Sequence, residues 1–299
     1  MKLFKTYLIS FICLLVINGC DKPAVTELTQ DNKQRLQVEI LAKDTNDEYY
    51  SADSSGVVDD LNGYTNVVTL SGIKITNGST TINTAFAQTI FFDRSRSVRR
   101  RNGRLIAYHT RLLGNAKFNS VEARSVPYTI RYNDEGTVQE ITLGLKHILN
   151  SRFQGQDFGY RYNSSVAFSF DFLLGLGGNS FNFDIPTPPE ITGSVRIEGK
   201  RNNNTLKAKL EWDGKNYPGF QIIVAASVSG SDRIFPLFRL RTKDDGELII
   251  PSGLINQIPP RFNEFMFYFV RRTEFHSERN NNDFYVLSQS IHRVDIDIP

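Results

Sequence analysis

The sequence predicts an all-β protein built from two β-sandwich domains. Apolar and polar residues alternate with a period of two in many segments, and this alternation is typical of a strand with one buried face. Clusters of Gly, Asn and Asp, which favour turns, separate these segments. The 299 residues also include 22 Phe and 12 Tyr against a single Trp. Aromatic residues are enriched in strands and fill the interiors of sandwiches.

Two hairpins are predicted in the first domain, which we place at residues 35–185. Residues 166–174 alternate regularly, and a strand at 181–185 returns after a Gly-rich turn. A second pair of strands, at 128–132 and 141–145, flanks a turn with the sequence Asn-Asp-Glu-Gly. Asn, Asp and Gly are the residues that tolerate the positive φ angles of tight hairpin turns. We therefore expect the first domain to be a β-sandwich.

A proline-rich linker at 186–189 is expected to separate the two domains. Its sequence, Pro-Thr-Pro-Pro, lacks three of four backbone donors. Such a segment cannot join a sheet ladder and favours a stiff extended chain. The second domain then spans 190–299, a length close to that of an immunoglobulin-type domain.

Seven strands are predicted in the second domain, where the alternation is the most regular in the chain. They are placed near 191–197, 206–212, 220–228, 234–242, 247–250, 264–275 and 283–298. A single helical turn is expected near 252–257, between two prolines. The strand count and spacing resemble an immunoglobulin or fibronectin type III sandwich, although the domain contains no cysteine pair. This resemblance implies a fold and carries no activity.

The first twenty residues have the layout of a secretory leader. Lys2 and Lys5 precede an apolar run at 8–17, and the segment ends in Ile-Asn-Gly-Cys with Cys20 last. The apolar run is shorter than the roughly 20 residues that a membrane-spanning helix requires. The layout resembles a bacterial lipoprotein signal. That resemblance implies removal of residues 1–19 as a signal peptide, a diacylglycerol on the Cys20 thiol, and a further fatty acid such as palmitate on its amine.

The same resemblance predicts where the protein resides. A lipid on Cys20 would anchor the chain to a membrane of the bacterial cell envelope, because two or more acyl chains make anchoring stable. Residues 20–34 are polar and lack periodicity, so we interpret them as a flexible tether between the lipid and the first domain.

Composition excludes several classes of function for the body of the chain. The formal net charge of +3 falls by two when Lys2 and Lys5 leave with the leader. Such a balanced charge argues against a nucleic-acid partner. Cys13 lies in the leader and Cys20 is the lipidation site, so the body has no thiol for a disulfide, a thiolate metal site or Cys catalysis.

We predict no catalytic residue, metal site or cofactor. The chain has four histidines, which are far apart in sequence: His109, His147, His276 and His292. No two of them have the spacing of a metalloprotease motif, and no Gly-x-Ser-x-Gly motif is present. His147 and His292 are in phase with apolar residues, which favours a structural role in their strands.

Acidic residues form two further features without a recognised motif. Those at 44–60 could supply oxygen ligands for calcium, but they lack the spacing of a calcium loop, so a solvated loop is the simpler interpretation. Asp244 and Asp245 precede Gly246, which is typical of a hairpin turn.

A run of arginines is the densest charged feature of the sequence. It consists of Arg94, Arg96, Arg99, Arg100, Arg101 and Arg104. Guanidinium groups pair bidentately with phosphate and carboxylate, so the run is a candidate patch for an anionic ligand such as a lipid headgroup or an acidic glycan. The alternative is a solvated hairpin loop between strands near 86–92 and 104–112.

Three aromatic residues form a second candidate binding feature. Phe158, Tyr160 and Tyr162 alternate along the chain after a polar segment. If they are exposed, they form an aromatic platform on which sugar rings stack. Packing in the core is the alternative.

Three hypotheses of function follow. The leading one is a non-catalytic envelope lipoprotein that binds or scaffolds another envelope or surface component. The second is a lipoprotein that binds a glycan or polyanion through the arginine run or the aromatic platform. The third is a hydrolase whose residues meet only in the fold. The expected partners are the membrane, through the N-terminal lipid, and another envelope protein or a glycan.

Overall fold

Nearly all of the described chain is β-structure. The computed structural model describes residues 25–29, 35–41, 64–134, 137–150, 158–173, 180–228, 234–279 and 282–298. The predicted signal peptide, Cys20 and the acidic residues at 44–60 lie outside the described residues. The prediction of an all-β sandwich fold is confirmed.

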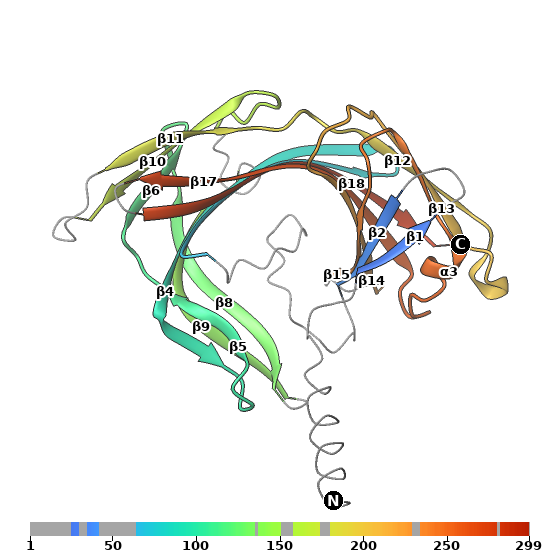
Figure 1. Ribbon diagram of the computed structural model, residues 1–299, viewed down its shortest axis with the longest axis horizontal. Helices are drawn as coiled ribbons and strands as arrows, with labels where there is room; N and C mark the ends of the chain where they lie inside the picture. The colour runs from blue at the N-terminus through green and yellow to red at the C-terminus, as the bar shows by residue number, and fades with distance from the viewer. Residues whose placement is uncertain are drawn as a thin grey trace, which may run out of the picture.

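One large sheet bends into an arch (Figure 1). In the described part of the chain it contains β1 (Val25–Thr29), β2 (Arg35–Ile40), β3 (Asn66–Asn77), β4 (Thr80–Arg99), β5 (Leu105–Thr110), β8 (Arg124–Asp134), β9 (Thr137–Asn150), β14 (Phe220–Ser227), β15 (Ile234–Arg241), β17 (Glu264–Arg279) and β18 (Asn282–Asp297). Their order is β1-β2-β15-β14-β17-β18-β3-β4-β9-β8, and β5 pairs with β4. The right-handed twist of neighbouring strands accumulates over so many strands and curves the sheet.

Two smaller sheets lie on the outer side of the arch (Figure 1). One has the order β11-β10-β6-β7 and is built from β6 (Gly114–Phe118), β7 (Val121–Glu122), β10 (Ser165–Phe172) and β11 (Phe181–Pro186). The other has the order β12-β13-β16 and is built from β12 (Gly193–Glu198), β13 (Lys207–Trp212) and β16 (Glu247–Ile250). The described helices are short, namely the 3-10 helix η2 (Arg201–Asn203) and α3 (Ser252–Ile255).

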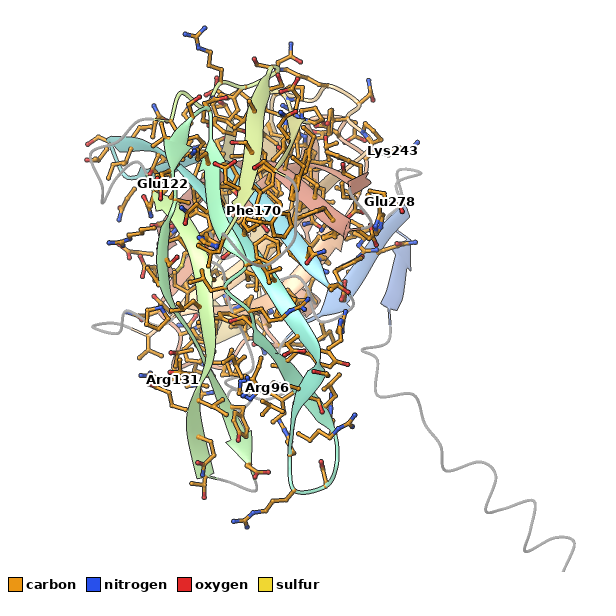
Figure 2. The ribbon with its side chains drawn as sticks, turned by 90° about the vertical axis from the view of Figure 1, so that its left-hand side faces the viewer. Arg96, Glu122, Arg131, Phe170, Lys243 and Glu278 are labelled. Atoms are coloured by element: carbon orange, nitrogen blue, oxygen red, sulfur yellow. The ribbon has the colours of Figure 1, made fainter. Side chains whose placement is uncertain are left out.

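Each small sheet encloses a hydrophobic core with one half of the large sheet. Phe168 and Phe170 of β10 are buried in one core, with Phe170 in the middle of the sheet face seen in Figure 2. Leu210 and Trp212 of β13 are buried in the other core. These residues belong to the faces that the alternation of the sequence assigned to the interior, because a strand with one solvated side buries every second residue.

The seven strands predicted after residue 190 are confirmed as β12 to β18. The first, second and fifth of them form one sheet, and the fourth, third, sixth and seventh are neighbours in the other. That is the arrangement of an immunoglobulin-like sandwich. The helical turn expected near 252–257 is α3, which lies between β16 and β17.

The two sandwiches share the large sheet, and this differs from two separate domains. β18 pairs in parallel with β3, from Phe284 opposite Asn66 to Asp295 opposite Asn77. β17 and β18 have 16 residues each, which is about 50 Å of extended chain. Strands of this length contribute residues to both cores. The large sheet therefore runs without a break from one sandwich to the other.

The segment predicted as a linker is packed rather than exposed. Thr187 and Pro188 are buried. The Thr187 hydroxyl donates to the carbonyl of Arg161 over 2.6 Å and accepts from the backbone N–H of Ser164 over 2.9 Å. The Asn163 N–H also donates to the Pro188 carbonyl. The expectation of a free linker at 186–189 is corrected, since side-chain and backbone bonds hold it against the first sandwich.

The predicted tether also contributes to the sheet. β1 lies within 20–34 and pairs with β2, which pairs in turn with β15. Leu36 and Val38 of β2 are buried in the core of the immunoglobulin-like sandwich. The start of the chain thus adds two strands to the sandwich formed by its end, so the tether interpretation does not hold for 25–29.

A buried histidine on β18 is hydrogen-bonded to residues of β3 and β12. His292 lies on β18, and its Nδ1 accepts a hydrogen bond from the backbone N–H of Gly193 over 2.8 Å. Its Nε2 therefore carries the proton and donates to the hydroxyl of Thr76 over 2.9 Å. Burial is the main cause that lowers the pKa of His292 to about 4, and the charge of Lys74 adds to the effect. The histidine is neutral and structural, as predicted.

Stability is expected to fall in acid because of His292. The unfolded chain takes up a proton near pH 6.5, whereas the folded chain resists it until the pKa of about 4. The contribution of His292 is therefore fully present above pH 6.5 and is lost as the pH falls towards 4, by roughly 2–3 kcal/mol. Urea unfolding at pH 7.5 and 4.5 measures this loss. In His292→Gln the difference between the two pH values should shrink by that amount, and an unchanged difference would contradict the assignment.

Candidate binding site

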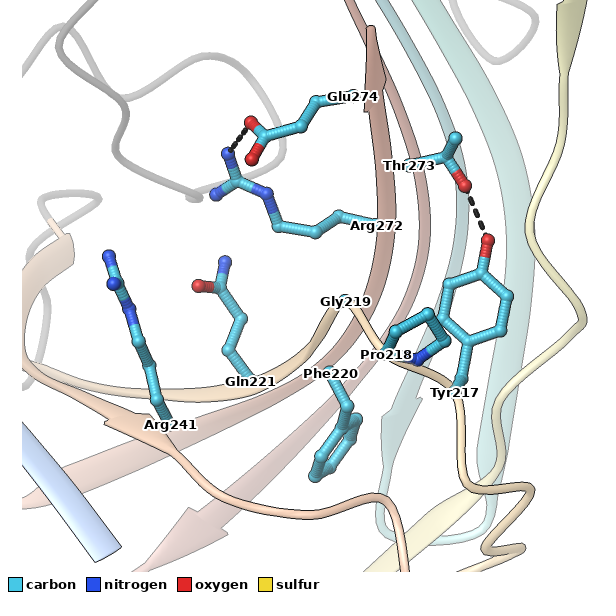
Figure 3. A pocket seen from close by; sticks show the side chains of 9 residues that line it. All are labelled: Tyr217, Pro218, Gly219, Phe220, Gln221, Arg241, Arg272, Thr273 and Glu274. Carbon is cyan, nitrogen blue, oxygen red and sulfur yellow. Dashed lines mark hydrogen bonds and ion pairs between the residues drawn. The ribbon is translucent and has the colours of Figure 1, made fainter.

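A pocket of about 490 Å³ opens on the side of the large sheet opposite the β12-β13-β16 sheet. It is lined by Tyr217, Pro218, Gly219, Phe220, Gln221, Arg241, Arg272, Thr273 and Glu274. These residues come from β14, β15 and β17 and from the segment before β14. Phe220 and Ile222 belong to the sandwich core, so Gln221 between them points to the other face of the strand. Figure 3 shows its amide between Arg241 and Arg272.

Gln221 has an unused hydrogen-bond donor. Its side chain is 3% exposed, and its Nε2 has no hydrogen-bond partner in the described part of the chain. Leaving a buried donor without a partner costs about 1–3 kcal/mol. A residue kept in this state beside an open pocket is well placed to donate to a ligand.

Arg272, Glu274 and Tyr285 form a hydrogen-bonded group at the rim. Arg272 donates through Nη2 to Glu274 Oε2 over 2.6 Å and to the Tyr285 hydroxyl over 3.3 Å. The Tyr285 hydroxyl donates to the same Glu274 oxygen. Burial alone would raise the pKa of Glu274, but the hydrogen bonds from Tyr285 and Arg272 and the positive charge of Arg272 hold it below its usual value. Glu274 is therefore ionised at neutral pH and can only accept.

Charged side chains of both signs lie around the pocket. Glu39 of β2 lies 3.3 Å from Arg239 and 3.5 Å from Arg241, measured from its Oε2 to their guanidinium nitrogens. Arg272 and Glu274 form a further ion pair on β17. The side chain of Arg241 is exposed, so one face of its guanidinium is accessible from the pocket.

Aromatic rings continue the site beyond Tyr285. Tyr64 stacks on Tyr285 with ring centroids 3.9 Å apart, and His276 lies 5.7 Å from each of them. His276 is exposed and its Nδ1 is 3.4 Å from an Asp283 oxygen. The ring of Tyr285 is thus held on one side while its hydroxyl orients Glu274.

A buried ion pair behind the pocket positions its wall. Arg271 is 0% exposed and donates to both oxygens of Asp244, over 2.8 and 3.1 Å. Asp244 also accepts from Trp212 Nε1 over 2.7 Å and from the Tyr217 N–H over 3.1 Å. Burial would raise the pKa of Asp244, but these hydrogen bonds keep it below its usual value. The pair fixes Tyr217, whose hydroxyl is hydrogen-bonded to Thr273 in the pocket.

Arg271 holds further parts of the chain in place. It donates to the carbonyls of Glu190 and Asp213, each over 2.5 Å. The chain turns at Asp244, and Gly246 has a φ of 109°, but the predicted hairpin is wrong, because β15 and β16 belong to different sheets and do not pair. The buried ion pair was missed in the sequence, since Asp-Asp-Gly is the composition of any solvated turn.

The arginine run lies along the outer part of the β4–β5 hairpin, where Figure 2 labels Arg96 on β4. β4 extends to Arg99, so much of the run belongs to a strand and only its end is loop. Arg94 lies over the ring of Tyr108 at 4.4 Å, and Arg99 donates to the carbonyl of Gly103 over 2.9 Å. The run is distant in the fold from β14 and β17, and binding by it stays a prediction.

The aromatic platform is part of the core instead. Phe158 is 1% exposed and belongs to the first sandwich core. Tyr160 packs against Gly72 and donates to the carbonyl of Gln289 over 3.0 Å. Tyr162 is half-buried, and burial raises its pKa to about 12. Phe158 and Tyr160 pack in or against this core and Tyr162 is half-buried, so the three rings do not form one exposed platform for sugars.

The remaining histidines offer little for catalysis. His147 is buried and is 3.3 Å from the Ser125 hydroxyl, but it forms no hydrogen bond to a carboxylate among the described residues. His109 Nδ1 bonds to the carbonyl of Leu143. No group of three or more potential metal ligands comes together in the residues that the structure covers. The polar pocket is therefore the strongest candidate site.

These features define a class, an all-β sandwich protein with a polar pocket on its large sheet. Comparison of the chain with known protein families and with curated proteins gives no match. In the described residues, no helix is both long enough and apolar enough to span a bilayer.

Proposed function

We propose that the chain is a non-catalytic, lipid-anchored protein of the bacterial cell envelope that binds a surface component in the pocket beside Gln221. The leader from Lys2 to Cys20 supports the anchor. Mass spectrometry of the mature N-terminus tests this part, and an unmodified Cys20 would overturn it.

The buried Nε2 donor of Gln221, which has no hydrogen-bond partner among the described residues, is the observation that carries the binding function. A volume of about 490 Å³ lies within the range of sites for small ligands and single sugar residues. Protein interfaces are instead centred on aromatic and apolar anchors. A pocket lined by two guanidiniums, an amide and a carboxylate favours a polar ligand rich in hydrogen-bonding groups. Of the envelope components, an acidic glycan has that chemistry.

Binding to acidic polysaccharide tests the proposal. In affinity electrophoresis, the full-length protein in detergent should be retarded by polygalacturonate or alginate and should migrate freely through dextran. Gln221→Leu should weaken the retardation about tenfold, because a hydrogen bond to a charged group is lost. The matched change Gln257→Leu, at an exposed position, should leave it unchanged.

Two outcomes would count against the proposal. Equal migration through gels with acidic and with neutral polysaccharide would show that the protein does not bind an acidic glycan. Loss of retardation in Arg99→Gln/Arg100→Gln/Arg101→Gln, with Gln221→Leu unaffected, would move the site to the arginine hairpin.

A further inference from the structure

We infer that one end of the immunoglobulin-like sandwich rests on the lipid headgroups of the membrane that anchors the chain. This end, which we name the basal end, consists of η2, the segment from α3 to β17 and the end of β18. Its exposed residues include Lys200, Pro259, Pro260 and Arg261. The inference rests on the proposed lipid at Cys20 and goes beyond it, because it names the protein surface that faces the bilayer.

The pairing of β1 shows which end of the sheet lies closest to the lipid. Val25 begins β1, and the pairs that link it across the sheet to Tyr268 of β17 run through Glu39, Arg239 and Ile223. Each of these ladders is antiparallel. The N-terminal end of β1 therefore points towards the end of the sheet where β17 begins, at Glu264. Figure 1 labels α3 and the C-terminus on the same side of the arch as β1.

The chain between the lipid and β1 is too short to lift the basal end off the bilayer. Cys20 precedes Val25 by five residues, which span at most about 18 Å when fully extended. From the level of Val25 the sheet continues over the four residues from Tyr268 to Glu264, about 13 Å of strand. With the strands upright, the lipid attachment lies at most about 5 Å beyond β17. The polar layer on each side of a bilayer core is about 5–8 Å thick, so the basal end reaches the headgroups.

The exposed residues of the basal end suit a surface of lipid headgroups. Lys200 precedes η2, and Arg261 follows two prolines at 259 and 260. A basic side chain close to an anionic membrane surface is attracted to it. The prolines have no backbone N–H, so they bring no donor that must be desolvated. Asp297 of β18 is also exposed at this end, so we expect the headgroup contacts to be made by Lys200 and Arg261.

Hydrogen bonds hold the two parts of the basal end together. Arg201 of η2 donates through Nη1 to the carbonyls of Phe262 and Pro260, over 2.6 and 3.2 Å. Asn256, which follows α3, donates to the carbonyl of Asn204 over 2.7 Å. Phe262 is 0% exposed and fixes the segment before β17 in the core. Lys200 and Arg261, which flank these bonded residues, are therefore held on one surface.

Fluorescence quenching by lipids that carry a nitroxide on the headgroup tests the inference. The full-length, lipidated protein is placed in phosphatidylcholine vesicles that contain phosphatidylglycerol. Since Cys20 is the only cysteine after the leader, one added cysteine carries the dye. A dye on Asn202→Cys, in η2, should lose most of its fluorescence. A dye on Lys215→Cys, at the other end of the same sandwich, should keep it. Gln37→Cys on β2 and Asn102→Cys between β4 and β5 report on the sheet edge and on the arginine hairpin, and all four positions are exposed.

A second comparison tests the contacts of the basic side chains with headgroups. The dye on Asn202→Cys should be quenched more strongly with phosphatidylglycerol present than in phosphatidylcholine alone, because anionic lipid attracts Lys200 and Arg261. Lys200→Gln/Arg261→Gln should abolish this difference. The matched change Lys215→Gln/Lys243→Gln, at exposed positions outside the basal end, should leave it unchanged. Circular dichroism confirms that each variant is folded.

The outcomes separate the inference from the proposed anchor. Strongest quenching at Gln37→Cys would mean that the protein lies on its sheet edge, and strongest quenching at Asn102→Cys that it rests on the arginine hairpin. Either result overturns the inference and leaves the anchor, as does quenching at none of the four positions. A lipid dependence that Lys200→Gln/Arg261→Gln leaves unchanged also overturns it. Uptake of the dye by the parent protein would show that Cys20 is unmodified, and this would overturn the anchor itself.

Discussion

Asp244→Ala is expected to lower the free energy of unfolding by about 3–5 kcal/mol, because it removes the buried counter-charge of Arg271 and leaves only the partly exposed Asp213 carboxylate, 3.5 Å away. Arg271 is wholly buried, and both of its bonds to a carboxylate end on Asp244 within 3.1 Å. The substitution also removes the acceptor of Trp212 Nε1 and of the Tyr217 N–H. Urea unfolding followed by far-UV circular dichroism measures the loss.

The neighbouring carboxylate is the control for this prediction. Asp245 is exposed, and Asp245→Ala should change stability by no more than about 0.5 kcal/mol. In Asp244→Ala/Arg271→Ala the buried guanidinium that lost its hydrogen-bonded carboxylate is gone, so the double variant should cost less than the sum of the two single variants. Strict additivity would show that the two side chains do not stabilise each other. Asp244→Ala should also weaken ligand binding, since Tyr217 loses its support.

Phe284→Ala should destabilise both sandwiches together, by about 3–5 kcal/mol. Phe284 is 0% exposed and lies on β18. Its ring packs in the first core, where its centroid is 4.8 Å from that of Phe181 and 5.9 Å from that of Phe183. Removing the ring leaves a cavity in that core. Because β18 also runs through the immunoglobulin-like sandwich, the loss should lower the stability of the whole protein.

The single tryptophan makes this prediction measurable. Trp212 lies in the core of the immunoglobulin-like sandwich, packed on Phe220. Its fluorescence transition in urea should therefore move to lower concentration in Phe284→Ala, in step with circular dichroism. Phe172→Ala removes a half-buried ring on β10 and should cost less. A Trp212 transition that stays in place while the dichroism shifts would mean that the two cores unfold independently.

The alternation of apolar and polar residues along the sequence was sufficient to predict the strands. The burial of β11 alternates strictly along Phe181–Pro186, as its sequence does, because one face packs on the core and the other meets water. The same rule located β12 to β18 and their immunoglobulin-like arrangement. It was less informative for β14, where all eight residues are buried. There the two faces of the strand are both covered, so the alternation disappears.

The extent of the large sheet depended on contacts between distant segments. Three prolines in four residues indicated a boundary, since each proline removes a ladder donor. The parts of the chain before and after this boundary are nevertheless joined in one sheet, because β18 pairs in parallel with β3. Parallel pairing joins segments more than 200 residues apart and requires no local turn, so no short sequence pattern reports it.

The candidate site was also decided by tertiary structure. The sequence determined that Arg272 and Glu274 share one face of a strand, because residues two apart in β-structure point the same way. Gln221 and Arg241 join them only through the order β15-β14-β17 in the bent sheet. Their polar character is indistinguishable in sequence from that of solvated residues. Binding chemistry in an all-β protein arises where strands from distant parts of the chain become neighbours, and that pairing is a property of the folded sheet.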